Sequence, residues 1–554
     1  MKRTPWPIAR HWLPLVVALL LLNAAVTFHN VWPTLWITTR HEFSIEIAVL
    51  VLLLAAYSEI FGPPRRWLMA CLTVPLLAMC IGRYAEVTAP ALYGRPVNVY
   101  WDTQHLPKVA AMLAEVASPW LLAVGALGLI VLLGALIFGL HWSLARVWDG
   151  LGAAATRRAL GAFAASLVAL YAVSSALEWS PRYWFSLPVT ATYGQQAAFL
   201  VEALVDGAQR SVPVEPLAQS DLQGVAGADV LLIFLESYGA TAYDDPAISQ
   251  VVGPSRAALQ TAAATTGRRV VSAFVESPTF GGASWLAHSS LMSGVEVKDT
   301  GMYNLLLTQS RETIPKRFAD SGYRAIAWMP GLRNAWPEGQ FYGFDAIYGE
   351  RELDYRGPDF GWWRIPDQYA LAKLDATELG RAARPPLFVF FSTINTHVPF
   401  RPTPPLQPTW SRLLTEEPYD APATAASLAR QPEWTNLGPA YAETLAYTFA
   451  YFASYLQERP DADFIMVLVG DHQPAASVSG QGARWEVPVH VITARDGIQD
   501  ALLEAGFTPG VELAAAGQPI GGMHELTTLL LHAFDSSGSL PLTTPGYGSE
   551  QGPR

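Results

Sequence analysis

The stretch Phe464-Ile-Met-Val-Leu-Val-Gly470, followed at once by Asp471 and His472, decides the fold of the second half of the chain. It is a continuous apolar run that begins after Asp463 and ends at a carboxylate, which predicts a β-strand buried on both faces. Functional groups in α/β proteins gather where such strands end. An aspartate and a histidine side by side at that point can both bind one divalent cation.

Three further runs have the same character, and helical patterns separate them. The strands are expected at Asp229–Glu236, Pro386–Ser392 and Val487–Thr493, and the helices at Pro439–Gln457 and Glu525–Ala533. Strands that alternate with helices indicate an α/β domain whose sheet is mostly parallel and sandwiched by helices.

Two more strand ends carry polar side chains suited to catalysis. Glu236 follows the run that starts at Asp229, and His397 follows the run that ends at Ser392. Because parallel strands end at one edge of a sheet, Glu236, His397 and the Asp471-His472 pair are expected to meet there. Taken singly, a carboxylate at a strand end is more often a helix cap or a surface residue.

The segment Phe280-Gly-Gly-Ala-Ser284 places a serine after two glycines, where a short helix is expected to begin. A hydroxyl at a helix N-terminus meets free backbone N–H groups and the positive end of the helix dipole, which favour an anionic substrate. Ser284 is therefore a candidate nucleophile, with Ser289 and Ser290 as competitors. The alternative explanation is an ordinary serine cap.

The N-terminal third of the chain is apolar and predicts a membrane anchor. Each of its five runs is close to the ~20 residues that cross a bilayer. The expected organisation is a five-helix transmembrane bundle over 1–180, a linker over 181–225, an α/β catalytic domain over 226–535 and a disordered Gly/Pro/Ser-rich tail over 536–554. The five helices are expected near 11–29, 43–61, 66–84, 118–140 and 159–178.

Basic residues between the runs predict the orientation of the bundle. Lys2 precedes the first run, Arg65 and Arg66 lie between the second and third, and Arg157 and Arg158 lie between the fourth and fifth. By the positive-inside rule these faces are cytoplasmic. Five crossings then place everything after about residue 180 outside the cytoplasm, which for a bacterial inner-membrane protein is the periplasm.

Charge and cysteine content exclude several kinds of partner and site. The net charge of -11 argues against nucleic acid as a partner. The two cysteines, Cys71 and Cys80, lie inside one apolar run, so the α/β domain has neither a disulfide nor a thiolate metal site. The loop segment Arg95–Asp102 is explained either as interfacial packing or as part of a lipid entrance.

Four short motifs occur in an order that resembles the sulfatase-like branch of the alkaline phosphatase superfamily. They are Leu-Glu-Ser-Tyr-Gly239, Gly-Gly-Ala-Ser284, Thr-His-Val-Pro-Phe400 and Val-Gly-Asp-His472. The likeness is to the membrane-bound lipoteichoic acid synthases, which are phosphoglycerol transferases, and to the phosphoethanolamine transferases. Those enzymes also combine five membrane helices with an extracytoplasmic α/β domain.

The resemblance implies roles for individual residues. Ser284 matches the nucleophile, which is usually threonine in both families, and His397 matches a histidine that contacts the phosphate or the leaving group. Arg364 and Asp367 match a stretch with candidate substrate contacts. The metal-binding set matches Glu236, Ser284, Asp471 and His472, for one divalent ion that is Zn²⁺ or Mn²⁺, with Mg²⁺ as an alternative.

The activity implied is metal-dependent transfer of a phospholipid head group, phosphoglycerol or phosphoethanolamine, to a cell-envelope glycan or lipid through a phosphoserine intermediate. Two alternatives share the same sequence features: a membrane-anchored phosphodiesterase or sulfatase-like hydrolase, and a non-catalytic envelope-assembly module. The Cys-x-Pro-x-Arg motif of true sulfatases is missing, which counts against sulfate-ester hydrolysis. The missing disulfides weaken the match to the lipid A phosphoethanolamine transferases.

Overall fold

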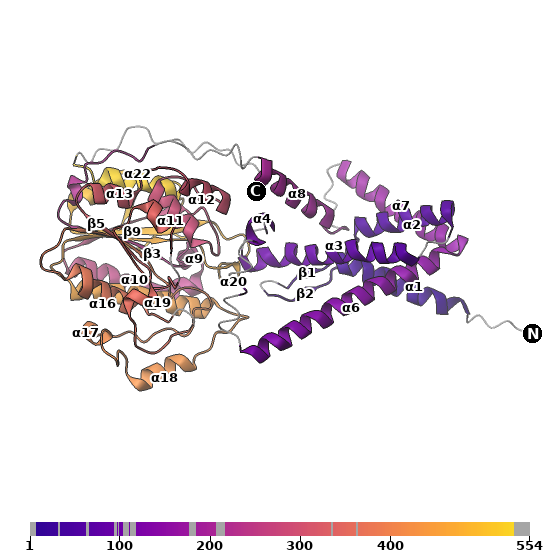
Figure 1. The fold of residues 1–554 in the computed structure, drawn as a ribbon, viewed down its shortest axis with the longest axis horizontal. Helices are drawn as coiled ribbons and strands as arrows, with labels where there is room; N and C mark the ends of the chain where they lie inside the picture. The colour runs from indigo at the N-terminus through magenta and orange to yellow at the C-terminus, as the bar shows by residue number, and fades with distance from the viewer. Residues whose placement is uncertain are drawn as a thin grey trace, which may run out of the picture. The chain divides into compact units, whose positions relative to one another are not determined.

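The chain divides into two compact units, residues 1–209 and 210–554 (Figure 1). The computed structural model describes residues 7–31, 34–62, 66–93, 97, 99–103, 110, 118–176, 184–205, 216–333, 336–361 and 364–536. The first unit is helical, and the second is an α/β domain. Of the predicted disordered tail, only Ser536 lies within the described residues.

Helices occupy all five predicted segments of the first unit, but fewer meet the demands of a membrane crossing. The helices are α1 (Pro7–Thr27), α2 (Ile45–Phe61), α3 (Arg66–Tyr93), α4 (Val99–Asp102), α6 (Pro119–Leu151), α7 (Ala154–Ala176) and α8 (Val189–Val205), with a hairpin of β1 (His29–Asn30) and β2 (Ile37–Thr38). Among the described residues, three stretches are long and apolar enough to span a bilayer: Trp67–Ala89, Pro119–Leu151 and Ala154–Ala176. Three apolar helices are thus present, and the count of five is not confirmed.

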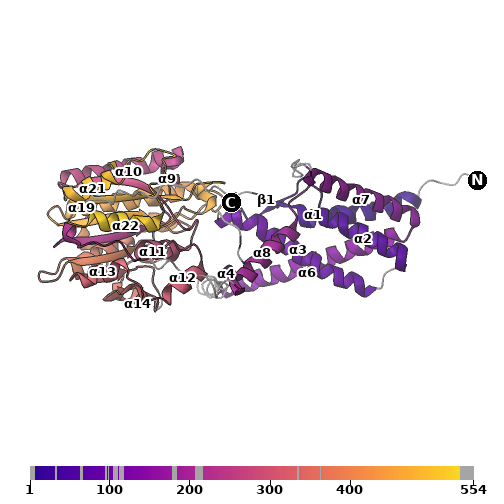
Figure 2. The ribbon, with the colours of Figure 1, turned by 90° about the horizontal axis from the view of Figure 1, so that it is seen from above.

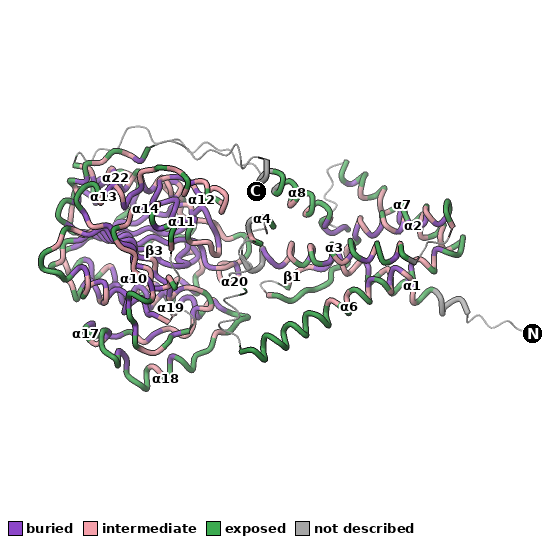
Figure 3. Tube along the Cα trace, viewed as in Figure 1, coloured by how far each residue is buried: buried purple, intermediate pink, exposed green. Residues whose placement is uncertain are grey.

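Local sequence explains where these helices begin and end. Ser44 caps α2 by accepting a hydrogen bond from the N–H of Ile47 at 3.2 Å, and Gly62 ends it with φ 75°. Proline occupies the first position of α6, where its missing N–H costs nothing. Figure 3 shows α6 exposed along most of its length, and exposure of an apolar helix on all sides fits a lipid environment.

The predicted linker contains structure of its own. Helix α8 lies within 181–225, and residues 206–215 of that segment lie outside the described residues. Of the Arg95–Asp102 segment, Val97 and the short helix α4 are described.

The second unit is built on one eight-stranded mixed sheet. Its strands are β3 (Asp229–Leu235), β4 (Arg269–Glu276), β5 (Arg324–Trp328), β6 (Ala346–Tyr348), β7 (Leu387–Ser392), β8 (Phe464–Gly470), β9 (Glu486–Thr493) and β10 (Thr508–Pro509), in the order β10-β4-β9-β8-β3-β7-β5-β6. The five strands from β8 to β6 are mutually parallel, whereas β9 is antiparallel to both of its neighbours. The expectation of a mostly parallel sheet is therefore wrong for the part of the sheet that contains β9, β4 and β10, where neighbouring strands are antiparallel.

The direction of β9 has a simple cause. The connection from β8 to β9 carries only the short helix α20 (Ala476–Ser479), so the chain turns back beside β8 instead of crossing over. Strand β4 is antiparallel to β9 and thus runs in the same direction as β8. The end of β4 at Glu276 consequently reaches the same sheet edge as the ends of β3 and β8, and the loop to Ser284 starts from there.

Helices cover both faces of the sheet, as predicted (Figures 1 and 2). One face packs on α10 (Pro246–Thr265), α16 (Asp367–Leu374) and α19 (Gly438–Glu458); the other packs on α11 (Ser284–Ser293), α13 (Ile314–Asp320), α21 (Asp496–Glu504) and α22 (Met523–Ala533). Alternate residues of β3 divide between the two cores: Leu231 and Ile233 join the first, and Leu232 and Phe234 join the second. Each such side chain contributes about 1.5–3 kcal/mol on burial.

Candidate active site

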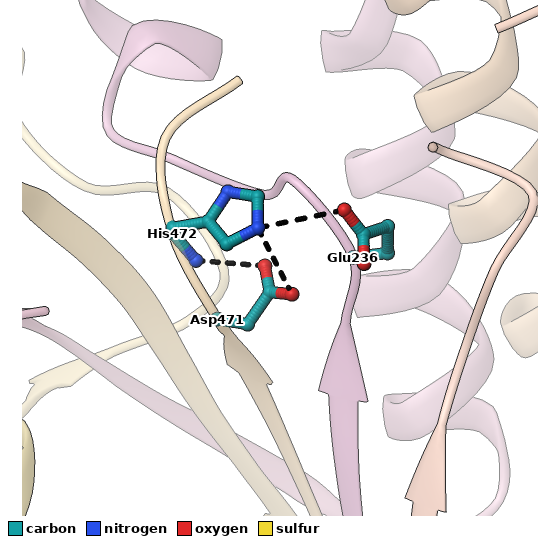
Figure 4. Close-up of side chains that lie close together, drawn as sticks. All are labelled: Glu236, Asp471 and His472. Atoms are coloured by element: carbon teal, nitrogen blue, oxygen red, sulfur yellow. Dashed lines mark hydrogen bonds and ion pairs between the residues drawn. The ribbon is translucent and has the colours of Figure 1, made fainter. Parts of the chain in front are cut away.

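Two adjacent strand ends bring the predicted metal ligands together. Leu235 of β3 lies opposite Gly470 of β8, so Glu236 and Asp471 are the next residues on neighbouring strands. Both of these side chains and that of His472 are buried. Figure 4 shows the three side chains pointing toward one another from the two strand ends. The site predicted from the sequence is thus assembled by the register of one strand pair.

Glycines permit the close approach of the two chain segments. A Cβ atom at Gly470 would lie 1.8 Å from the carbonyl oxygen of Tyr238, and one at Gly239 would lie 1.9 Å from Oε1 of Gln473. No side chain larger than a hydrogen fits at either point. The residues that follow Glu236 therefore pack directly against those that flank Asp471.

The geometry of the three side chains suits a divalent cation. Their ligand atoms all lie within 4.8 Å of one another, and Nε2 of His472 is 3.5 Å from oxygens of both Glu236 and Asp471. Nδ1 of His472 is 2.7 Å from the carbonyl oxygen of Gln473, so this nitrogen donates a hydrogen bond to that carbonyl. Nε2 faces the two carboxylates, and from this position it could bind a cation that they share.

The pKa values of the two carboxylates are shifted in opposite directions because their neighbours differ. Burial raises the pKa of Asp471 well above its ordinary value, and the charge of Glu236 raises it further. Burial also acts to raise the pKa of Glu236, but the charges of His472 and His397 and a hydrogen bond from Ser237 outweigh it and leave the pKa lowered. A second negative charge at this point is costly without a cation.

Ser284 is the first residue of α11, and its hydroxyl contacts this cluster. Its Oγ lies 3.3 Å from Oε2 of Glu236 and 3.2 Å from Nε2 of His472. The residue before it, Ala283, has φ 62°, a left-handed conformation that is strained for a residue with a Cβ atom. The strained turn holds the hydroxyl at the helix N-terminus, beside the buried carboxylates.

The competing serines have structural partners instead. Ser289 is hydrogen-bonded to the carbonyl of Trp285 and, at 2.7 Å, to the hydroxyl of Tyr342. Ser290 donates to the carbonyl of Leu286 at 2.8 Å and accepts from the N–H of Val297 at 2.9 Å. Both are fully buried. Among these serines, Ser284 is thus the one that contacts the cluster.

His397 lies on the loop after β7, within electrostatic reach of the cluster. The neighbouring Thr396 donates a hydrogen bond from its hydroxyl to the carbonyl of Glu236, and the charge of His397 lowers the pKa of Glu236. The side chain of His397 is half-buried, with Nδ1 2.8 Å from the carbonyl of Val398. The structure therefore brings His397 to the same sheet edge, as the sequence predicted.

Asp367 and Arg364 are engaged by protein partners. Asp367 is fully buried, and its carboxylate accepts hydrogen bonds from the N–H groups of Ile394 at 2.9 Å and Asn395 at 2.8 Å. It thereby holds the loop that leads to His397, and burial raises its pKa to about 7. Arg364 donates to Asp359 at 2.8 Å and to a second carboxylate, Glu350, at 2.9 Å.

Several residues that support the cluster were missed by sequence reasoning. The Ser237 backbone N–H donates to Asp471 at 2.8 Å, and the Ser237 hydroxyl donates to Glu236 at 2.8 Å. Ser277 donates to the carbonyl of Asp471 at 2.6 Å, and Thr393 accepts from the N–H of Glu236 at 3.0 Å. Only Ser237 stood inside a recognised motif, whereas Ser277 and Thr393 lie outside the quoted motifs and become neighbours through strand pairing.

No family model and no curated protein matches this chain. Several solved structures do match it, all at low sequence identity. Lipoteichoic acid synthase LtaP from Listeria monocytogenes is 14% identical, with 61% of this chain and 81% of that chain covered and a TM-score of 0.34. Streptococcus pyogenes phosphoglycerol transferase GacH, in complex with sn-glycerol-1-phosphate, is 13% identical, with 62% of this chain and 91% of that chain covered and a TM-score of 0.35.

The C-terminal periplasmic domain of phosphoethanolamine transferase EptC from Campylobacter jejuni is 11% identical, with 57% of this chain and 95% of that chain covered and a TM-score of 0.33. At such values no residue role is transferred from these proteins, and the roles considered below rest on the side chains of this chain. This protein is similar, at low identity, to solved members of the alkaline phosphatase superfamily.

Proposed function

We propose that the protein transfers a phospholipid head group, phosphoglycerol or phosphoethanolamine, to an acceptor in the cell envelope, a glycan or a lipid, through a phosphoserine at Ser284. The observation that carries this proposal is the contact of the Ser284 hydroxyl with both Glu236 and His472 in a buried cluster at a helix N-terminus. Glu236, Asp471, His472 and the Ser284 oxygen would hold one divalent metal. The histidine ligand favours Zn²⁺ or Mn²⁺ over Mg²⁺.

A bound metal would lower the pKa of the serine hydroxyl and stabilise negative charge on a phosphate oxygen. The first step is attack of Ser284 Oγ on the phosphorus of the lipid. With Ser284 deprotonated as a ligand of the metal, the Oγ–P bond forms and the bond from phosphorus to the diacylglycerol oxygen breaks. Diacylglycerol then leaves with a proton from His397. The N–H groups at the start of α11 stabilise charge on the phosphate.

The second step returns the enzyme to its starting state. A hydroxyl of the acceptor attacks the phosphoserine, its oxygen forms the new bond to phosphorus, and the Ser284 oxygen leaves. We infer that His397 donates a proton to the departing diacylglycerol and takes one from the acceptor. Asp367 positions His397 by holding the backbone at Ile394 and Asn395, which we infer is its role instead of a substrate contact.

The membrane unit supports the choice of donor. Three helices long and apolar enough to cross a bilayer lie in the same chain as the site. We infer that α1 and α2 complete a five-helix bundle over 1–180 in a bacterial inner membrane, with 181–225 as linker and 226–535 on the periplasmic side. A donor phospholipid of the outer leaflet is then on the side of the catalytic domain.

The decisive experiment follows the fate of a phospholipid labelled in its head group and looks for an adduct on Ser284 by mass spectrometry. Ser284→Ala should lower diacylglycerol release by at least about 10³-fold, because the nucleophile is lost, and Ser284→Thr should keep activity. Ser290→Ala is the matched control and should stay within a few fold.

Other outcomes have defined meanings. Unchanged diacylglycerol release by Ser284→Ala would remove Ser284 as the nucleophile. Release of a free head group with no labelled acceptor would indicate a hydrolase. Purified protein without bound metal and without turnover would support a non-catalytic envelope-assembly module.

A further inference from the structure

A pocket lies at the edge of the sheet that carries the candidate active site. Its volume is about 310 Å³, and Leu332, Arg333, Trp336, Ile347, Arg351 and Glu352 line it. This volume is at the lower end of the ~300–1,000 Å³ typical of small-molecule sites. The pocket forms where β5 and β6 end, and both strands are parallel to β7 and β3. It therefore opens at the carboxyl edge of the same sheet.

The frame of the pocket is built before any ligand arrives. The N–H of Met329 donates to the carbonyl of Tyr348 at 2.9 Å, and the N–H of Glu350 donates to the carbonyl of Leu332 at 2.8 Å. A Cβ atom at Gly349 would lie 2.6 Å from that Leu332 carbonyl, so only glycine permits this approach. A preformed frame loses little entropy when a ligand binds.

One wall of the pocket is aromatic and rigid. Trp336 stacks on Tyr342 with ring centroids 5.5 Å apart and an interplanar angle of 29°, and it lies 6.3 Å from the ring of Phe344. The ring is half-buried, which leaves part of it for contact with a ligand. Leu332 and Ile347 extend the apolar surface. Such a wall suits the flat C–H face of a sugar ring.

The charged groups of the pocket are paired with one another or with a neighbouring carboxylate. Arg351 has a side chain 94% exposed and lies 3.2 Å from Glu352. Arg333 donates to Glu350 at 3.1 Å, and Glu350 also accepts from Arg364. The lining holds two arginines and one glutamate, and each guanidinium is paired with a carboxylate, Arg333 with Glu350 and Arg351 with Glu352. The pocket thus offers hydrogen-bond donors and an acceptor, but no guanidinium without a carboxylate partner to select a phosphate. This chemistry fits the hydroxyl groups of an uncharged ligand.

We propose that this pocket holds a sugar ring of the acceptor, and that the acceptor is a neutral glycan. The inference rests on the proposed function, because it assigns the class of molecule that receives the head group. Trp336 supplies the stacking surface, Arg351 and Glu352 supply hydrogen bonds to ring hydroxyls, and a neighbouring unit of the glycan extends along the sheet edge toward Ser284.

The first test measures binding without turnover. Full-length Ser284→Ala protein in detergent is titrated with laminarihexaose, a neutral glucose hexasaccharide, and saturation-transfer NMR follows the sugar protons. Trp336→Leu and Arg351→Ala, each added to the Ser284→Ala protein, should weaken binding at least fivefold. Arg356→Ala is the matched control, because Arg356 forms a similar exposed pair with Asp354 at 3.1 Å outside the lining residues.

Each result then supports or overturns the assignment. No saturation transfer, or equal affinity in the Trp336 and Arg351 variants, would overturn the sugar site. Displacement of the hexasaccharide by glycerol 1-phosphate, in a manner that depends on Arg351, would overturn its assignment to a neutral ligand. Binding as expected together with no diacylglycerol release by the wild-type protein would leave the sugar site standing and overturn the proposed transfer instead.

Discussion

Neighbouring groups, more than residue type, decide what each carboxylate at this sheet edge does. Glu236 and Asp471 face the imidazole of His472, and the three side chains together could hold a cation. Asp367 faces two backbone N–H groups and accepts from both. The sequence predicted carboxylates at this edge and made Asp367 a candidate substrate contact. The bonds of Asp367 to Ile394 and Asn395 could not be predicted, because they exist only in the folded chain.

Asp367 gives a pH-dependent stability prediction. Its pKa is about 7 in the fold and 3.8 as a free side chain, which corresponds to roughly 4 kcal/mol. Since the native state binds the extra proton between these values, the contribution of Asp367 to stability is fully present below about pH 4 and is lost as pH rises through 7. The side chain of Asp367→Asn does not titrate. As pH rises from 4 to 7.5, the unfolding free energy of the wild type should therefore fall relative to that of the variant, by up to roughly 4 kcal/mol.

Thermal or urea unfolding of both proteins between pH 4 and pH 7.5 measures this difference. Other titrating groups are common to the two proteins and cancel. A difference that stays constant over this range would show that Asp367 does not bind a proton on folding.

At the scale of elements, the site depends on the close approach of the segments at the ends of β3 and β8. Gly470→Ala would place a Cβ atom 1.8 Å from the Tyr238 carbonyl, so the two chain segments must separate. Asp471 follows Gly470 directly and should move away from Glu236. We expect loss of bound metal, measured by elemental analysis of the purified protein, and a fall in stability of several kcal/mol.

Gly253 provides the matched control for that substitution. It lies inside helix α10, and a Cβ atom there would meet nothing within 4 Å apart from its neighbours in the chain. Gly253→Ala should therefore keep the metal and change stability by less than about 1 kcal/mol, because the helix propensity of alanine is opposed by the contact of its Cβ atom with Pro254. Equal metal content in the two variants would contradict the prediction that the close approach at Gly470 holds the metal ligands together.

The sequence patterns predicted several buried strands and where they end, but not the direction of every strand in the sheet. Asp229–Leu235, Leu387–Ser392 and Phe464–Gly470 are continuous apolar runs, and each lies where predicted. Strand β4 (Arg269–Glu276) was missed because Ser272 and Ala273 interrupt its apolar pattern, although Ser272 is fully buried and bonded to His490. The antiparallel direction of β9 follows from a connection without a crossover helix, which composition alone does not reveal.

At the scale of the whole molecule, each unit has its own hydrophobic core. Residues of α1, α2, α3 and α6 form one core, and the two cores of residues 210–554 lie on the faces of the mixed sheet. A unit with its own core is expected to fold alone. The apolar runs predicted a membrane unit from composition, but the two shorter helices α1 and α2 do not by themselves establish two further crossings.

This independence yields a prediction about the anchor. Residues 210–554, produced alone, should be soluble, bind metal and cleave a short-chain, water-soluble phosphatidylglycerol at a rate within a few fold of the full chain, because Glu236, Ser284, Asp471 and His472 all belong to this unit. Cleavage of phospholipid in vesicles should fall at least tenfold relative to full-length protein reconstituted in the same lipid. The membrane unit confines the site to the bilayer surface and so raises the effective concentration of donor, and this advantage disappears when the units are separated. Equal rates on vesicles would show that the anchor contributes nothing to donor delivery, while loss of activity on the short-chain lipid as well would show that the first unit completes the catalytic site.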